Sequence, residues 1–159
     1  MSAPPELIPF TGVWEVYEEL IYQAFLDSFV RREVEFNGLK VSAPYRPESR
    51  GKHFSFWHVI SEAPNKDNRN EDDRIPDLAR CARICWISWA IDHADNKEIL
   101  WWENRRGNSA HVVIWARNHD FAVVLAKRSN YYVLKTAYAE IKPHRRKTFE
   151  REHQAFWGN

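Results

Sequence analysis

The sequence holds few of the residues on which several common kinds of site depend. Among its 159 residues there are only five Gly and two Cys. No Gly-rich phosphate loop and no CxxC pair occurs, which argues against nucleotide-dependent chemistry and against a zinc site built on paired thiols. Cys81 and Cys85 are four residues apart in a helical pattern, a spacing that disfavours a disulfide. We therefore expect reduced thiols and a cytoplasmic location.

Long apolar runs are missing as well. No run approaches the 18 apolar residues of a membrane span, and the start, MSAPPELIPF, lacks the basic region and apolar core of a signal peptide. The His, Asp and Glu residues do not fall at metal-ligand spacing, and there is no GxSxG motif. We expect no membrane, no metal, no cofactor and no serine or cysteine nucleophile.

Aromatic residues and a divided charge are what the chain does have. Eight Trp, nine Phe and six Tyr, within 44% apolar residues, predict one globular domain over residues 1–159. Residues 1–100 carry 12 Lys or Arg and 17 Asp or Glu, a net charge of −5, whereas residues 101–159 carry 11 and 5, a net of +6. A cationic region with interleaved Trp and Tyr is typical of contact with RNA. A solvated sheet edge guarded by Lys and Arg is the alternative explanation.

The last third of the chain predicts the fold class. Four short runs rich in Val, Ile, Trp and Tyr alternate with clusters of hairpin length, which predicts an antiparallel meander. We expect an α+β fold in which N-terminal helices pack on this four-stranded antiparallel sheet, followed by a C-terminal helix. The boundaries are a helical and hairpin part over 11–94, the sheet over 98–140, and the last helix over 143–157.

The loop positions also predict a register. Lys127 should lie opposite both His111 and Tyr132, Arg117 opposite Phe121, and Val123 opposite Thr136. One bulky and polar face then carries nine residues: His111, Val113, Trp115, Arg117, Val123, Lys127, Leu134, Thr136 and Tyr138. Arg128 falls on the other face, although a single β-bulge would move it to join Thr136.

Chemistry without a cofactor is available to such a face. RNA supplies its own nucleophile, the 2′-OH, so cleavage needs a base, an acid, and cations or hydroxyls that stabilise the charged phosphorane. Lys127, Thr136 and Tyr138 lie together on the predicted face, and the segment of His58 can close over it. Taken one at a time, His58 is equally explained as a core histidine, and Thr136 and Tyr138 as ordinary strand residues.

Six segments, in this order, resemble a known superfamily. They look like phage- and mobile-element-borne proteins of the barnase, EndoU, colicin and RelE (BECR) nuclease superfamily, over about residues 45–152. The segments are FWHVISE (56–62), DLARCARICW (77–86), WWENRRG (101–107), VVLAKR (123–128), YYVLKTAY (131–138) and HRRK (144–147).

The resemblance implies metal-independent RNA cleavage that leaves a 2′,3′-cyclic phosphate, in a toxin-like setting. Carried over by position, His58 is the catalytic histidine, Arg128 a phosphate-binding cation, and Thr136 with Tyr138 the pair that contacts the scissile phosphate. Because the predicted register places Arg128 on the other face, Lys127 is its substitute.

Further residues are candidates for RNA binding rather than for chemistry. Trp102 either stacks a base or lies in the core, and the cations crowded into the first turn of the last helix favour a bound phosphate. The full set is Arg105, Arg106, Trp102, His111, Arg117, His144, Arg145 and Arg146.

Two other function classes stay open. One is a non-catalytic RNA- or protein-binding module on the same fold. The other is an inhibitor that acts by protein contact, for which the acidic loop over 67–73 is the expected surface. For a ribonuclease toxin, an antitoxin or immunity protein is an expected partner.

Overall fold

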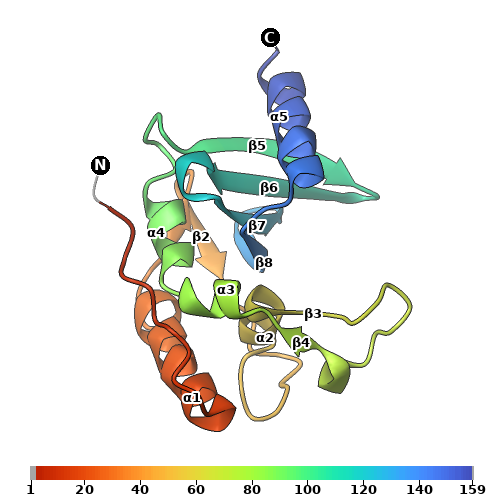
Figure 1. Cartoon of the computed structure of the whole chain (residues 1–159). Helices are drawn as coiled ribbons and strands as arrows, with labels where there is room; N and C mark the ends of the chain where they lie inside the picture. The colour runs from red at the N-terminus through yellow and green to blue at the C-terminus, as the bar shows by residue number, and fades with distance from the viewer. Residues whose placement is uncertain (1–2, 159) are drawn as a thin grey trace.

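The meander expected in the last third of the chain forms as an antiparallel sheet. The computed structural model describes residues 3–158; residues 1, 2 and 159 of the expected domain lie outside the described residues. Consecutive strands pair antiparallel through short turns (Figure 1). They are β5 (Leu100–Arg106), β6 (Ser109–Ala116), β7 (Phe121–Lys127) and β8 (Tyr132–Ala139).

The antiparallel meander of four strands is confirmed, but two more strands join it, so the sheet has six strands and is mixed rather than purely antiparallel. An early hairpin, β1 (Glu35–Phe36) and β2 (Leu39–Ser42), turns at Asn37 and Gly38, which both have positive φ. Strand β2 pairs in parallel with β8, which gives the order β1-β2-β8-β7-β6-β5. Local turn signals carry no information on such a distant pairing.

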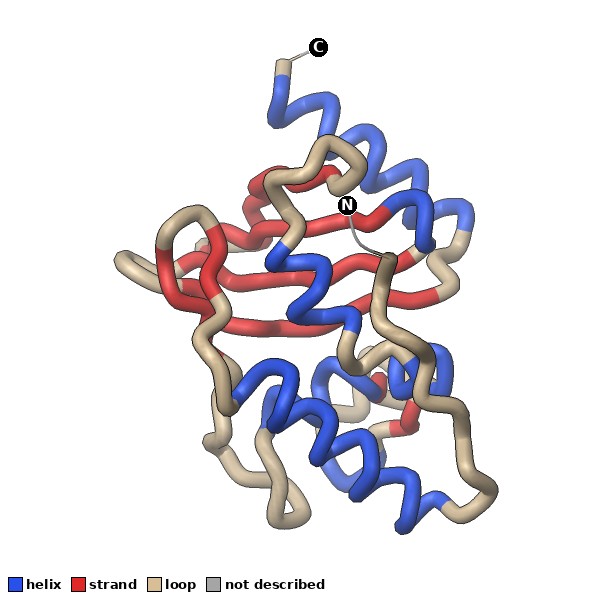
Figure 2. The backbone as a smooth tube through the Cα atoms, turned by 90° about the vertical axis from the view of Figure 1, so that its left-hand side faces the viewer, coloured by secondary structure: helices blue, strands red, loops and turns tan. Residues whose placement is uncertain are grey.

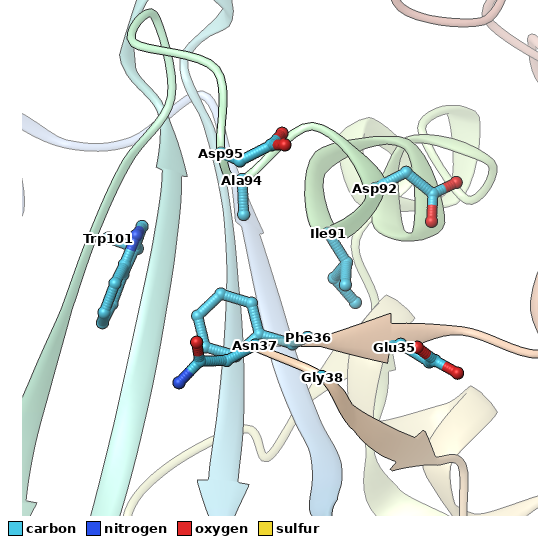
Figure 3. Close-up of a pocket in the computed structure, with 9 residues that line it drawn as sticks. All are labelled: Glu35, Phe36, Asn37, Gly38, Ile91, Asp92, Ala94, Asp95 and Trp101. Atoms are coloured by element: carbon cyan, nitrogen blue, oxygen red, sulfur yellow. The ribbon is translucent and has the colours of Figure 1, made fainter.

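The six strands curl into a half-barrel whose outer strands approach each other. The ring of Phe36 in β1 stands edge-on to the ring of Trp101 in β5, with centroids 5.3 Å apart. Figure 3 shows these two rings among the residues that line a pocket beside the hairpin. The curl gives the sheet an inner face, which most of the helices cover.

The remaining elements are mainly helical. They are α1 (Trp14–Phe25) with a π-helical extension over Leu26–Val30, α2 (Phe54–Ile60), the short strands β3 (Ser61–Glu62) and β4 (Ile75–Pro76), 3-10 turns over Glu71–Asp73 and Arg117–His119, α3 (Leu78–Ala82), α4 (Trp86–Asp92) and α5 (Pro143–Trp157). The backbone leaves the helical conformation at Arg83, between α3 and α4. This break lets Trp86 of α4 pack edge-on against Phe121 of β7.

The meander buries a different layer on each face. The α4 face, which α4 crosses in Figure 2, carries Val112, Ile114, Ala116, Phe121, Val123, Leu125, Leu134 and Ala137. The α5 face carries Trp102, Val113, Trp115, Ala122, Val124 and Tyr138, with Phe149 of α5 buried against it. Both layers follow from the alternation of side chains along a strand.

The predicted register was wrong by one residue between β6 and β7. Ala116, not Arg117, pairs with Phe121, and His111 pairs with Ala126 instead of Lys127. The reason is that Arg117 belongs to a 3-10 turn, so the loop is one residue longer than Asn118 to Asp120. A slip of one residue exchanges the faces of a whole strand.

None of the helices within residues 3–158 is both long enough and apolar enough to cross a bilayer.

Candidate functional site

The register arranges the α5 face in rows that run across the four strands. We call the end of this face at the β7–β8 turn the open end, and the end at the start of α5 the covered end. From the open end toward the covered end, the rows are Asn104, His111, Ala126 and Val133; then Trp102, Val113, Val124 and Thr136; then Leu100, Trp115, Ala122 and Tyr138. Helix α5 covers the β5 side of these rows, where Phe149 contacts the rings of Trp102 and Trp115. The polar residues of the first two rows lie at its flank.

A β-bulge in β8 decides which cation faces Thr136. Val124 pairs with Thr136, but the next residue of β7, Leu125, pairs with Leu134, so Lys135 has no partner in the ladder. The bulge restores the alternation in which Ala126 and Arg128 share the face of Thr136. The prediction that Lys127 takes the place of Arg128 on the face of Thr136 was therefore wrong, while the predicted pairing of Lys127 with Tyr132 is confirmed.

Lys127 points to the opposite face. Its ammonium group lies 3.2 Å from the Glu103 carboxylate, which belongs to the row of Val112 on the α4 face. Arg128 donates its backbone N–H to the carbonyl of Tyr131, as the Ser129-Asn130 turn requires. Of the two neighbouring cations, Arg128 is the one that acts on His111, whose pKa it lowers.

His58 lies at the edge of β8, because α2 packs along that strand. The Thr136 hydroxyl donates to the backbone carbonyl of His58 at 3.1 Å. The imidazole stacks on Phe54, and its Nε2 lies 2.8 Å from a Glu71 carboxylate oxygen. The structure thus joins His58 to Thr136 through the backbone, while the ring, with a side chain 24% exposed, turns toward Glu71.

The environment of His58 favours its neutral form. Burial lowers the pKa of the imidazole, and the cations Arg74 and Lys135 act in the same direction, whereas Glu71 opposes them. A carboxylate at Nε2 accepts the proton of that nitrogen, so the lone pair of the neutral ring is on Nδ1. A neutral imidazole near pH 7 is able to accept a proton.

His111 is the second imidazole of the site. Burial lowers its pKa, and Arg106, Lys135 and Arg128 lower it further. Its Nδ1 atom is buried without a hydrogen-bond partner. These cations come from the end of β5, from β8 and from the loop after β7, so they surround the ring from three segments of chain.

Tyr138 stands between two guanidinium groups at the covered end. Arg145 of α5 lies 4.2 Å from the centre of its ring, and Arg80 of α3 lies 5.3 Å from it. Arg80 is 5% exposed and forms ion pairs with Glu62 and Asp77. These residues and His144 line a pocket of about 390 Å³ beside the start of α5.

The other predicted RNA-binding residues do not gather there. Trp102 is fully buried and donates its indole N–H to Glu152 at 3.1 Å, which corrects the base-stacking hypothesis in favour of the core. Arg117 lies 3.9 Å from Glu150, and Arg146 lies 2.7 Å from Asp120. Arg105 is exposed in β5 near its turn.

The pocket of Figure 3 suits a different kind of ligand. It measures about 350 Å³ and lies between the hairpin, α4 and β5, with Trp101 and Phe36 as aromatic walls. Its charged residues are the carboxylates of Glu35, Asp92 and Asp95. The three carboxylates of this pocket would repel a phosphate, unlike the cations at the α5 face.

The thiols do not provide a nucleophile. Burial raises the pKa of Cys81 to about 12 and raises that of Cys85 as well, so neither forms a thiolate readily. In the described part of the chain, no three His, Cys, Asp or Glu residues gather as metal ligands.

Sequence reasoning missed three residues of this site. Lys135 is the extra residue of the bulge in β8, and a bulge has no local sequence signal. Glu71 belongs to the acidic loop, which Arg50 holds through the carbonyls of Glu71 and Asp72. Arg80 is buried although it is charged, and its side chain type alone predicts an exposed position.

Comparison of the chain with protein-family models, with curated proteins and with solved structures finds no match.

Proposed function

We propose that this protein is a metal-independent endoribonuclease that cleaves RNA by attack of the 2′-OH on the adjacent phosphate. One observation carries the proposal. The bulge in β8 gives Thr136 and Arg128 the same face as His111, and α2 holds His58 at the edge of that face. Two imidazoles, cations and a hydroxyl are the groups that this reaction needs.

Each group has a role that its surroundings support. His58, with a lowered pKa, takes the proton of the 2′-OH. Arg128 neutralises the phosphate, the Tyr138 hydroxyl donates a hydrogen bond further along the RNA strand, and Thr136 positions His58 by donating its hydroxyl proton to the carbonyl of that residue. Arg106 and Arg145 guide the strand along the flank of α5. Products are a 2′,3′-cyclic phosphate and a free 5′-OH.

The setting that we propose is toxin-like. The resemblance to the BECR nucleases and the α+β arrangement of helices on a meander together support a barnase- and RelE-like scaffold. An enzyme of this kind in the cytoplasm needs an antitoxin or immunity protein to restrain it. Such a partner would cover the α5 face, where the basic half of the chain is exposed.

A binding module without catalysis is the second candidate. It is favoured by the contact between His58 Nε2 and Glu71, which engages one ring nitrogen of the proposed base. In this case the α5 face holds RNA and leaves it intact.

Incubation of the purified protein with total RNA in EDTA tests the proposal. We expect cleavage to 2′,3′-cyclic phosphate ends, and its loss in His58→Ala and Arg128→Ala. Lys127→Ala is the matched control, because it removes the adjacent cation on the opposite face, and it should cleave like the native protein. RNA binding without cleavage would support the module and overturn the enzyme.

A further inference from the structure

Trp101 of the edge strand β5 belongs to two pockets. The first is the pocket of Figure 3, which measures about 350 Å³ and lies beside Phe36 and the hairpin. The second measures about 280 Å³ and lies toward the end of α5, where Trp157 lines it. Because both pockets are lined by Asp95 and Trp101, they form one groove across β5, which we call the Trp101 groove.

Aromatic rings supply much of the contact surface of this groove. The ring of Trp101 lies 5.3 Å from that of Phe36 and 5.1 Å from that of Trp157, measured between centroids. Trp157 and its neighbour Phe156 remain 49% and 41% exposed. Exposed aromatic side chains that gather in one place are typical of a surface that binds another protein.

The first pocket is acidic. Its charged lining residues are Glu35, Asp92 and Asp95. Arg32, which does not line the pocket, pairs with Asp92 at 2.9 Å. Within residues 3–158, no Lys or Arg forms an ion pair with Glu35 or Asp95, and both side chains are exposed. The pocket therefore offers two carboxylates and an indole ring to a positively charged group.

The second pocket has no such excess of negative charge. Asp95 is balanced there by Lys97, and the remaining titratable side chain is His153. Burial lowers the pKa of His153, and Arg117 lowers it further, so this ring is neutral near pH 7. The groove thus accepts a cation at one end and an uncharged side chain at the other.

The loop that carries Asp95 is held by Asn96. The side-chain oxygen of Asn96 accepts from the N–H of Glu98, and its backbone carbonyl accepts from the N–H of Ile99, both at 2.9 Å. A loop that is ordered before a ligand arrives loses little conformational entropy on binding.

We propose that the Trp101 groove binds a basic segment of a partner protein, with an arginine or lysine side chain in the first pocket and an adjacent apolar side chain in the second. The cationic group lies against the indole of Trp101, in the pocket that Glu35 and Asp95 line. Two joined pockets exceed the size of one guanidinium or ammonium group, which is why the occupant is a peptide segment. The inference goes beyond the proposed ribonuclease function, because this acidic groove does not bind RNA.

The first test is an NMR titration with the synthetic peptide acetyl-Leu-Arg-Leu-amide. Its control replaces arginine by citrulline, which keeps the shape of the side chain and lacks the charge. We expect the arginine peptide to shift the indole N–H signal of Trp101, which is assigned by its loss in Trp101→Phe. The citrulline peptide should bind about tenfold more weakly, and added salt should weaken only the arginine peptide.

A pair of variants tests the role of the carboxylates. Asp95→Asn should weaken binding of the arginine peptide by about three- to fivefold, because one of the two carboxylates without an ion pair is lost. Glu98→Gln is the matched control, since it removes the same charge from an exposed position of the same loop that lines neither pocket. It should bind like the native protein. Circular dichroism checks that both variants retain the fold.

Three results would overturn the proposal. Equal binding of the arginine and citrulline peptides, or equal binding by the two variants, would show that the pocket does not select a cation. If acetyl-arginine amide bound as tightly as the peptide, the occupant would be a small cation rather than a segment. If the Trp101 signal moved with protein concentration alone and sedimentation showed a dimer, a second copy of the chain would occupy the groove. None of these readouts depends on RNA cleavage, so they leave the ribonuclease proposal untouched.

Discussion

Trp102 is a case in which a side chain has two plausible uses and its surroundings decide between them. It lies in the basic half of the chain, as a base-stacking residue would, yet it is fully buried among Trp115, Phe149 and His153. Trp102→Ala should therefore lower the free energy of unfolding by about 3–5 kcal/mol, because it leaves a large cavity. Urea denaturation followed by circular dichroism measures this loss.

Trp102→Phe serves as the control for that substitution. It keeps an aromatic ring in the layer and removes the hydrogen bond to Glu152, so its cost should be clearly smaller. If Trp102→Ala kept native stability and weakened RNA binding, the indole would belong to the interface after all.

The choice between Lys127 and Arg128 shows the limit of sequence reasoning for single side chains. His111 and Thr136 share one face of the sheet, as the alternation along the strands predicts. Which of the two adjacent cations shares the face of Thr136 depends on whether β8 holds one extra residue. The sequence from Leu134 to Thr136 gives no sign of that extra residue. Only the paired strand fixes that count.

Helix α5 depends on one buried ring. Phe149 is 1% exposed and packs edge-on against Trp102, Trp115 and Tyr138. Phe149→Ala should destabilise the protein by about 3–5 kcal/mol and release the helix from the sheet. Amide hydrogen exchange should then show faster exchange along α5 than along β6 and β7.

Phe156→Ala is the matched change on the same helix. Its side chain is 41% exposed, so less apolar surface is lost and the effect on exchange should be small. Equal effects of the two substitutions would mean that the end of α5, not Phe149, attaches it.

Elements with local signals were predictable, and elements set by distant partners were not. Asn37-Gly38 fixed the early hairpin, short polar loops fixed the order of the meander, and Pro143 marked the start of α5. The parallel pairing of Val41 with Tyr132 joins segments about ninety positions apart and left no local pattern. The break between α3 and α4 likewise depends on how Trp86 packs on β7.

Four partly buried histidines should make the stability of the whole protein depend on pH. Burial lowers the pKa of His53, His58, His111 and His153 below the usual 6.5. Between pH 6.5 and these lowered values the unfolded chain binds more protons than the folded protein, so acid favours unfolding. The urea midpoint should stay level above pH 7 and fall as the pH decreases below about 6.5.

Equilibrium urea unfolding curves at pH 5, 6, 7 and 8 and constant ionic strength measure the slope of the urea midpoint against pH. The replacement of His53 by Gln should reduce it, because one of the four titrating groups is gone, although the bond between His53 and the Tyr22 hydroxyl makes the variant less stable at every pH. A midpoint that rises on acidification would contradict the burial of these rings.

The contact between Phe36 and Trp101 bears on how the molecule behaves among its own copies. The outermost strands of an open sheet are templates for fibril growth. Here the two edge strands, β1 and β5, contact each other through these rings. In addition, the Trp157 indole donates to the Trp101 carbonyl at 2.7 Å, so this acceptor is not free to bind a strand of another chain. Because its two edge strands lie against each other, the sheet offers little free edge to which another copy of the chain could add a strand.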